Sequence, residues 1–299
     1  MRTYLYLLSL PAAALCAVLP RQTPSALAAA DISSFKPFTF FASAAYCPPS
    51  TTKTWTCGGD CDALADFIPR ATGGDGTVVQ FWFVGYHPPL DSIVVAHQGT
   101  NPDKILPVVV DADAFLEDLD PEMFPGLPDG VKAHQGFQDA HALTASDVKT
   151  AVLDTMSQFN TSNIVLSSHS LGAAISMLDA LYLKLNLPEG TNFKFVGYGT
   201  PRVGNQAFAD FVDSQLPDLT RINNKQDPVP IVPGRFLGFR HPSGEVHISS
   251  SGQFLSCDTQ DDTATGCIDD TEGNIFDSSL GDHSGPYDGV VIGNCDDDT

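Results

Sequence analysis

A serine at the end of an apolar run is the residue of this chain best placed for covalent chemistry. Ser170 lies in the turn 168–172 (SHSLG), which follows the apolar stretch 163–168 and precedes a helical pattern rich in small residues. A strand, a sharp turn and a helix in this order expose a serine hydroxyl above a sheet. Small residues two positions either side, here Ser168 and Gly172, keep the strand and the helix from colliding. The pattern favours a nucleophile that attacks carbonyl carbon over a serine that only caps a helix.

A serine nucleophile needs a histidine base and a carboxylate that orients the base. Where the serine sits in a strand–turn–helix motif, the carboxylate and the histidine follow it along the chain. Asp227 precedes a stiff Pro-Val-Pro loop able to hold a carboxylate in one orientation, although on local sequence alone it could equally cap a turn. Three histidines come later: His241 before a turn, His247 in an alternating strand pattern and His283 between glycines. The residues alone leave all three as candidates for the base.

The segments around these residues alternate between strand and helix patterns. Five short runs rich in Val, Ile and Phe are typical of strands buried on both faces. Two longer runs, 133–160 and 170–187, carry apolar residues at helical spacing. This alternation predicts one α/β domain with a mostly parallel central sheet and flanking helices, the first strand pair running antiparallel to the rest. The expected strands are 77–86, 92–97, 163–168, 193–198 and 219–223.

The first 30 residues have the pattern of a secretion signal. Arg2 precedes an apolar run over residues 5–19, and three alanines, 28–30, offer a cleavage site. A membrane anchor is the alternative, but prolines interrupt the run, which falls short of about 20 residues. We therefore expect a cleaved signal over residues 1–30, including a short pro-segment, and a secreted catalytic domain over residues 31–299.

The chain is strongly acidic, with a formal net charge of −21. Such a surface repels nucleic acid and anionic lipid headgroups, so we expect neutral or cationic partners and no nucleic-acid binding. Outside the expected signal, no apolar run is long enough to span a bilayer, so we expect no stable membrane insertion. Much of the acid lies in residues 258–272, where a solvated loop is the plain interpretation. A calcium loop starting at Asp261 is the alternative, but threonines occupy two of its ligand positions.

Six cysteines remain outside the expected signal, and an even count in an exported chain predicts three disulfides with 15 possible pairings. Spacing favours Cys57–Cys61 and Cys257–Cys267 as short loops, which leaves Cys47 and Cys295. A zinc site is the alternative, but the chain has no Cys-x-x-Cys pair. The one glycosylation sequon begins at Asn160 and predicts a surface loop there.

Several motifs together resemble the fungal class 3 lipases, secreted α/β-hydrolases that also include feruloyl esterases. They recur in the family's order across about residues 36–295. Two positions differ from the family's pattern: Ser168 replaces a glycine, and His97-Gln98 stands where Phe-Arg is common. The matching motifs are FASAAYC (41–47), VVAHQGT (94–100), HQGF (134–137), SSHSLGAA (167–174), YGTPRVGN (198–205), NNKQDPVPIVP (223–233) and GDHSGPYDG (281–289).

The resemblance implies an α/β-hydrolase fold and a role for each site residue. Ser170, Asp227 and His283 would form the catalytic triad. Thr100 and the backbone N–H of Leu171 would stabilise the oxyanion of the tetrahedral intermediate. It also implies the bridges Cys47–Cys295, Cys57–Cys61 and Cys257–Cys267. The chemistry needs no metal or cofactor.

The family's lid falls directly after Thr100, in residues 101–113. Ile105 with Val109, and Leu106 with Val110, are four residues apart and would share one helical face; a β-strand is the alternative. An apolar lid favours a triacylglycerol lipase that acts on lipid esters at an oil–water interface. A feruloyl esterase, or another esterase for soluble substrates, is the second hypothesis. A non-catalytic lipid-binding relative is the third.

Overall fold

A computed structural model describes residues 23–100, 115–271 and 278–295. The predicted lid residues Ile105, Leu106, Val109 and Val110 lie outside the described residues, as do residues 1–22 of the expected signal. Within these ranges, none of the helices is both long and apolar enough to cross a bilayer.

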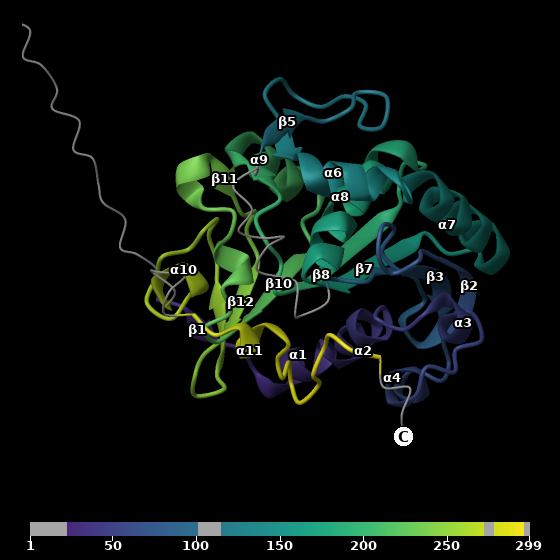
Figure 1. Cartoon of the computed structure of the whole chain (residues 1–299), viewed down its shortest axis with the longest axis horizontal. Coiled ribbons are helices and arrows are strands. Elements are labelled where there is room, and N and C mark those ends of the chain that lie inside the picture. The colour runs from purple at the N-terminus through teal and green to yellow at the C-terminus, as the bar shows by residue number, and fades with distance from the viewer. Residues whose placement is uncertain (1–22, 101–114, 272–277, 296–299) are drawn as a thin grey trace, which may run out of the picture.

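A nine-stranded sheet forms the centre of the molecule (Figure 1). Its five middle strands, β12, β10, β8, β7 and β4, are parallel, and antiparallel strands flank them on both sides. This confirms the predicted, mostly parallel sheet and the antiparallel first strand pair, β3 and β4. In spatial order the strands are β1 (Ser25–Ala26), β13 (Phe254–Cys257), β12 (Glu245–Ile248), β10 (Leu219–Asn224), β8 (Asn192–Tyr198), β7 (Asn163–His169), β4 (Ser92–His97), β3 (Trp82–His87) and β2 (Ile68–Gly73).

Helices cover both faces of this sheet (Figure 1). One face packs against α6 (Gln135–Ala142), α7 (Ala145–Phe159), α8 (Leu171–Asn186) and α9 (Gln206–Gln215). The other face packs against the N-terminal helices α1 (Ala29–Ser34), α2 (Lys36–Ala44), α3 (Pro49–Thr52) and α4 (Gly59–Ala63). Short helical turns complete the chain: η1 (Pro88–Leu90), η3 (Val229–Ile231), η4 (Arg235–Leu237), α10 (Ile268–Thr271) and α11 (Leu280–His283).

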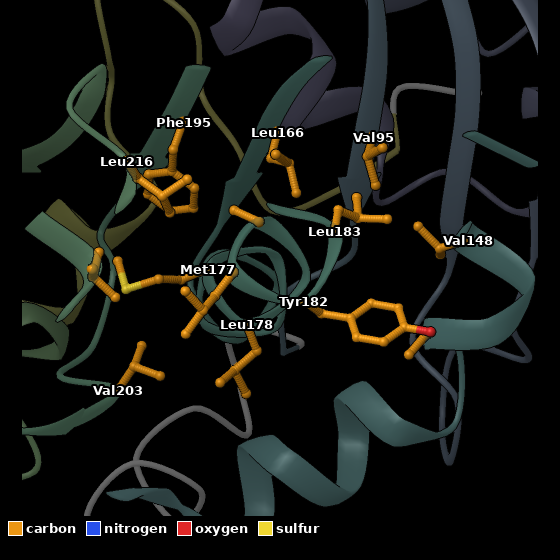
Figure 2. Packing of buried hydrophobic residues seen from close by; sticks show 14 of the residues in the cluster. Val95, Val148, Leu166, Met177, Leu178, Tyr182, Leu183, Phe195, Val203 and Leu216 are labelled. Carbon is orange, nitrogen blue, oxygen red and sulfur yellow. The ribbon is translucent and has the colours of Figure 1, made fainter. Parts of the chain in front are cut away.

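The helix α8 is central to the larger apolar core. Leu183 extends from it toward Val95 and Leu166 of the sheet, and Leu178 projects from the opposite side of the helix (Figure 2). Nearly every residue between Gly172 and Leu183 is buried because α8 lies between the sheet and α6. Ser170 therefore precedes a helix that is buried in the core.

Two predicted elements have different boundaries in the structure. The strand expected from residue 77 begins at Trp82, because Asp75 Oδ1 accepts three successive N–H groups, from Thr77, Val78 and Val79, and closes a turn there. The helix expected over 133–160 is divided into α6 and α7. Thr144 separates them, and both its N–H and its hydroxyl donate to the carbonyl of His141.

A second, small antiparallel sheet lies apart from the first and was not predicted. Its strands are two or three residues long and carry no periodic signal that a sequence pattern could reveal. Their spatial order is β11 (Phe239–Arg240), β9 (Gly204–Asn205), β6 (Lys132–His134) and β5 (Leu116–Asp118).

The segment before the expected cleavage site is part of the fold. Ser25 and Ala26 pair with β13, and the N–H of Leu27 donates to Phe254 O. The helix α1 begins at Ala29 and continues past the expected boundary at residue 30. The position of that boundary stays a prediction.

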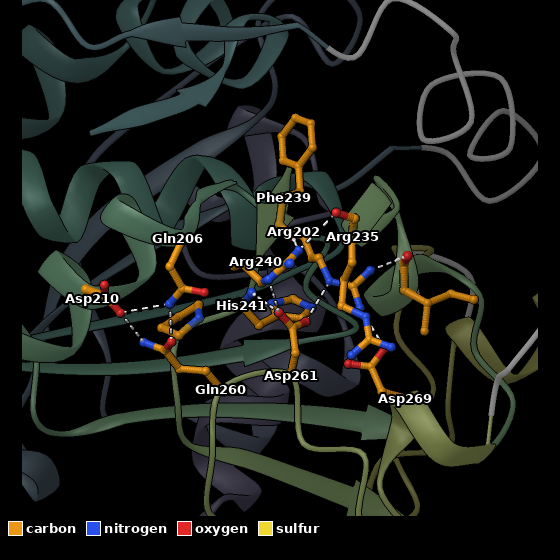
Figure 3. A network of polar contacts seen from close by, with 12 residues as sticks. Arg202, Gln206, Asp210, Arg235, Phe239, Arg240, His241, Gln260, Asp261 and Asp269 are labelled. Atoms are coloured by element: carbon orange, nitrogen blue, oxygen red, sulfur yellow. Dashed lines mark hydrogen bonds and ion pairs between the residues drawn. The ribbon is translucent and has the colours of Figure 1, made fainter. Parts of the chain in front are cut away.

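A buried arginine binds the acidic segment (Figure 3). Arg202 Nε donates to Asp261 Oδ1 at 2.7 Å, and its Nη2 donates to Asp269 Oδ1 at 2.6 Å. Its Nη1 donates to the carbonyls of Ile231 and Pro233. Asp261, the first residue of the alternative calcium loop, is therefore paired with a guanidinium group.

The three disulfides of the structure are Cys47–Cys295, Cys57–Cys61 and Cys257–Cys267. They are the pairs that the family resemblance implies. Asn160 is exposed at the C-terminal end of α7, in the left-handed conformation. Its accessibility suits glycosylation, which stays a prediction.

The bridge between Cys47 and Cys295 should contribute most to stability, since it spans 248 residues. In the chain-entropy model a loop of this size stabilises the folded state by about 4 to 5 kcal/mol. Replacing both cysteines with alanine should lower the midpoint of thermal unfolding by roughly 8 to 20 °C. The matched control removes Cys57–Cys61, which spans only four residues, and should lower the midpoint less. An equal loss in both variants would contradict the expectation.

Candidate active site

Ser170 lies at the junction of β7 and α8 in a strained backbone conformation. Its φ is 59° and its ψ is −131°, a region that residues other than glycine rarely adopt. Such strain costs on the order of 1–3 kcal/mol and is concentrated at functional sites. The N–H of Ser170 donates to Tyr198 O at 2.9 Å, which fixes the turn to the end of β8. Ser170 Oγ is buried and has no hydrogen-bond partner in the described chain.

The turn depends on a glycine two residues after the serine. A Cβ atom at Gly172 would lie 2.1 Å from His97 O, so the helix could not approach β4 with any larger residue. Two residues before the serine, Ser168 Oγ accepts the N–H of His97 at 2.8 Å and lies 2.7 Å from Ser176 Oγ. The hydroxyl at position 168 is therefore fully used and links β7 to β4.

Asp227 and His283 meet beside the same turn. Asp227 Oδ2 lies 2.8 Å from His283 Nδ1, and its Oδ1 accepts the N–H of Val229 at 2.8 Å. Both side chains are buried. The two bonds fix the carboxylate, and the carboxylate fixes the Nδ1–H tautomer of the imidazole. His283 Nε2, the atom that a base would use, is buried and has no partner in the described chain.

The position of Gly199 places Asp227, His283 and Ser170 at one edge of the sheet. It directly follows β8, and a Cβ atom there would lie 2.8 Å from both Asp227 Oδ2 and His283 Nδ1. The preceding residue, Tyr198, accepts the Ser170 N–H. The three residues predicted to form a triad therefore converge on the end of β8.

A chain of hydrogen bonds through Tyr46 and His169 leads to the backbone of His283. His169 Nε2 donates to His283 O at 2.8 Å, because a carbonyl oxygen can only accept. In the neutral ring the other nitrogen, His169 Nδ1, then accepts from Tyr46 Oη at 2.7 Å. Burial, followed by the nearby charge of His283, lowers the pKa of His169 well below its ordinary value, so this ring stays neutral. Tyr287 Oη also donates to His283 O, at 2.9 Å. Two donors thus hold the backbone of the base.

The predicted oxyanion residues lie next to Ser170. Gly99 is so close that a Cβ atom there would lie 2.9 Å from Ser170 Cβ. Thr100 follows it, and its Oγ1 is buried and has no partner in the described chain. Leu171 begins α8, and N–H groups in the first turn of a helix have no helical acceptor. Together they present unused donors at the positive end of the helix dipole.

Within the described ranges, one group of metal-ligating side chains has all its ligand atoms close enough together to hold a metal ion. Glu245, Cys257 and Cys267 place their ligand atoms within 4.8 Å of one another. Cys257 and Cys267 are joined in a disulfide, so neither offers a thiolate. The cluster therefore does not fit a metal ion.

Comparison with known proteins identifies the family. The family model described as "Lipase (class 3)" matches residues 94–237. A secreted mono- and diacylglycerol lipase of Malassezia globosa, MDL3, is 34% identical over 224 residues, which cover 74% of this chain and 70% of that relative. The chain belongs to the class 3 lipase family.

Other class 3 lipases extend the comparison. The secreted mono- and diacylglycerol lipase LIP2 of Malassezia restricta is 33% identical over 187 residues, and the chain spans only 59% of its length. The solved structure of the Rhizomucor miehei triacylglyceride lipase is 25% identical, with a TM-score of 0.78, and the match covers 91% of this chain and 99% of that one. The fold is that of the fungal α/β-hydrolase lipases.

Two features of this class 3 lipase would not have been found from its sequence motifs. Tyr46 and His169 lie inside motifs that match the family, but the motifs by themselves indicate no role for either residue. Their contact with His283 depends on α2 lying against β7. Gln98 occupies a position where Arg is common in the family. Its side-chain Oε1 accepts the Phe81 N–H, and its backbone N–H donates to Phe81 O. These two bonds anchor the loop that carries Thr100 to the residue before β3.

Proposed function

We propose that this protein is a secreted carboxylester hydrolase that cleaves acylglycerols, with Ser170, Asp227 and His283 as its triad. One observation carries the proposal. A buried, strained serine and a carboxylate-bound histidine occupy the same edge of the sheet, and each presents an unpartnered polar atom. A serine that only capped a helix would need neither the strain nor the histidine.

The geometry supports an acyl-enzyme mechanism. Ser170 Oγ attacks the ester carbonyl carbon while His283 Nε2 takes its proton. Asp227 holds the imidazole and stabilises its positive charge. Thr100, through its N–H and hydroxyl, and the N–H of Leu171 donate to the oxyanion. His283 then returns the proton to the leaving alcohol, and a water molecule releases the acyl group by the same steps in reverse.

Exposed apolar side chains support a lipid substrate. Phe236 and Leu237 in η4 are exposed by 90% and 46%, and Phe115, before β5, by 56%. The two segments are neighbours, since a Cβ atom at Gly238 would lie 3.3 Å from Leu116 Cδ1. Removing apolar surface from water contributes about 25 cal/mol per Å². An oil surface would therefore bind this part of the molecule favourably.

Triacylglycerol is the substrate that the apolar lid sequence favours. The names of the Malassezia relatives favour mono- and diacylglycerols as a second candidate, whereas the Rhizomucor miehei neighbour is named a triacylglyceride lipase. The difference concerns how many acyl chains the substrate carries, not the chemistry at Ser170.

A hydrolysis panel tests the proposal. It compares emulsions of mono-, di- and triacylglycerol, a dissolved short-chain ester and methyl ferulate. We expect acylglycerols to be cleaved faster than methyl ferulate, and the rate on a partly soluble triacylglycerol to rise abruptly once droplets form. The interface stabilises a form of the enzyme with exposed apolar surface and so shifts the population toward it.

Two outcomes would overturn the proposal in different ways. A smooth rate curve through the solubility limit, together with faster cleavage of methyl ferulate, would favour a feruloyl esterase. A folded protein that binds lipid emulsions but cleaves no ester would be a non-catalytic lipid-binding relative.

A further inference from the structure

A buried carboxylate that the proposed mechanism does not use lies in the core beneath the active site. Asp179 is in α8, and its side chain is inaccessible to solvent. Its Oδ2 lies 2.6 Å from Nε2 of His97, the last residue of β4. Its Oδ1 lies 3.0 Å from Nε2 of His141 in α6, close enough for an ion pair but not aligned as a hydrogen bond.

The surroundings of this cluster are apolar. The rings of Phe124 and Tyr182 pack on His141, with centroids 5.6 and 5.5 Å away, and the neighbours of Asp179 along α8 belong to the apolar core (Figure 2). A carboxylate at such a site is strongly destabilising unless it is paired. A class 3 lipase with the common Phe-Arg pair has no imidazole at position 97 for such a carboxylate to bind.

Asp179 is ionised in the folded protein. Burial raises its pKa, but the close polar contacts and charges of His141 and His97 outweigh burial and lower the pKa to about 2. The other groups that face the cluster are the phenol of Tyr182 and, beyond it, Lys149, whose Nζ lies 5.6 Å from the centroid of the Tyr182 ring. The carboxylate can therefore accept a hydrogen bond from His97 over the whole pH range in which an esterase would be assayed.

His97 connects this carboxylate to the oxyanion loop. Three parts of the residue are fixed: its imidazole by Asp179, its N–H by Ser168 Oγ at 2.8 Å, and its carbonyl by the close approach of Gly172. Three residues further along the chain is Thr100. A shift of His97 along the β4 axis would move Thr100 relative to the nucleophile.

We propose that Asp179 is a positioning residue, which fixes His97 and thereby holds Thr100 at the distance from Ser170 that oxyanion stabilisation requires. The proposal rests on the proposed function, because it needs Thr100 to act on an oxyanion. The oxyanion forms only as the carbonyl is attacked, so Asp179 contributes to kcat and leaves KM nearly unchanged.

The decisive variants are Asp179→Leu and Asp179→Asn. Leucine removes the acceptor from His97, and we expect kcat on a dissolved p-nitrophenyl ester to fall by roughly 10- to 100-fold, since small displacements of a catalytic group have effects of this size. We expect KM to change by less than about twofold, because substrate binding does not use the oxyanion contact. Asparagine keeps an oxygen for the His97 N–H and should restore kcat to within about threefold of wild type.

His141→Leu is the matched control. It removes the other partner of the same buried carboxylate and leaves in place the contact between Asp179 and His97, through which the carboxylate is linked to Thr100. We expect it to lower the thermal midpoint as Asp179→Leu does, with kcat near that of wild type. Active sites are counted by titration with a p-nitrophenyl alkylphosphonate, so that unfolded protein does not lower the apparent kcat.

If Asp179→Leu does not fold, His97→Leu tests the contact between His97 and Asp179 by removing the imidazole. It leaves Asp179 paired with His141. A wild-type kcat in folded Asp179→Leu or folded His97→Leu would overturn the inference. So would a loss of kcat in His141→Leu equal to that in Asp179→Leu. The proposed function fails separately: in that case wild-type protein would cleave none of the esters. Active wild type with equally active variants would contradict only the role of Asp179.

Discussion

Ser170→Ala should lower kcat for ester hydrolysis by about 10³-fold or more, the loss expected for a triad residue. The variant removes the attacking oxygen and leaves the turn intact, because serine and alanine have the same backbone preference at a φ of 59°. Its thermal midpoint should match that of wild type, since Ser170 Oγ makes no hydrogen bond in the described chain. The measurement is the initial rate on a dissolved short-chain ester, with the midpoint determined on the same protein.

Ser167→Ala is the control for this experiment. Ser167 lies in the same strand but donates to Phe38 O at 2.8 Å on the opposite face of the sheet. Its loss should destabilise the fold by about 1 kcal/mol and leave turnover unchanged. Near-normal turnover of Ser170→Ala would move the nucleophile to another residue. An equal loss of turnover in both variants would indicate that disturbed packing, and not the missing oxygen, is responsible.

His283→Ala should be as inactive as the serine variant, with kcat again about 10³-fold or more below wild type. Without the His283 imidazole, Ser170 loses the base that the proposal assigns to its hydroxyl proton. The double variant of Ser170 and His283 should be no slower than either single one, because residues that act as a unit are not additive. The test compares all three rates on one ester, above the buffer-catalysed background.

The other two late histidines provide controls of equal burial. His241 Nε2 lies 2.7 Å from Pro230 O, and His247 Nε2 lies 2.9 Å from Lys225 O. Each binds a backbone carbonyl, so replacing it with alanine should lower stability and leave kcat close to wild type. If His241→Ala or His247→Ala were inactive while His283→Ala was active, the assignment of the base would be wrong.

The convergence of the proposed triad could be predicted because it depends on a simple property of parallel sheets. Ser170, Gly199 and Asp227 each follow a strand, and the carboxyl ends of parallel strands lie at one edge. The strands β4, β7, β8 and β10 were predicted to within one residue at each end, since buried β-branched runs give a strong signal. Ser170 and Asp227 could therefore be placed from the residues, whereas the choice of His283 among three late histidines depended on the family resemblance.

The cluster around Asp179 could not be predicted in this way. His97, His141 and Asp179 are separated by about 40 residues each, and no spacing rule connects them. One signal was present: Asp179 lies four residues after Ile175, at an apolar position of the α8 pattern. A carboxylate at such a position must have a buried partner, but only the packing of α6 and β4 against α8 shows that the partners are two histidines.

The bridge between Cys47 and Cys295 has a consequence for synthesis. The second thiol is made 248 residues after the first, which takes roughly 10 to 50 s at ordinary rates of translation. During that time Cys47 is a free thiol close to Cys57, whose backbone oxygen lies 3.9 Å from Cys47 Sγ in the finished fold. A non-native bond between these neighbours can form long before the correct partner leaves the ribosome. We therefore expect the yield of secreted enzyme to depend on the disulfide isomerase activity of the host's secretory pathway.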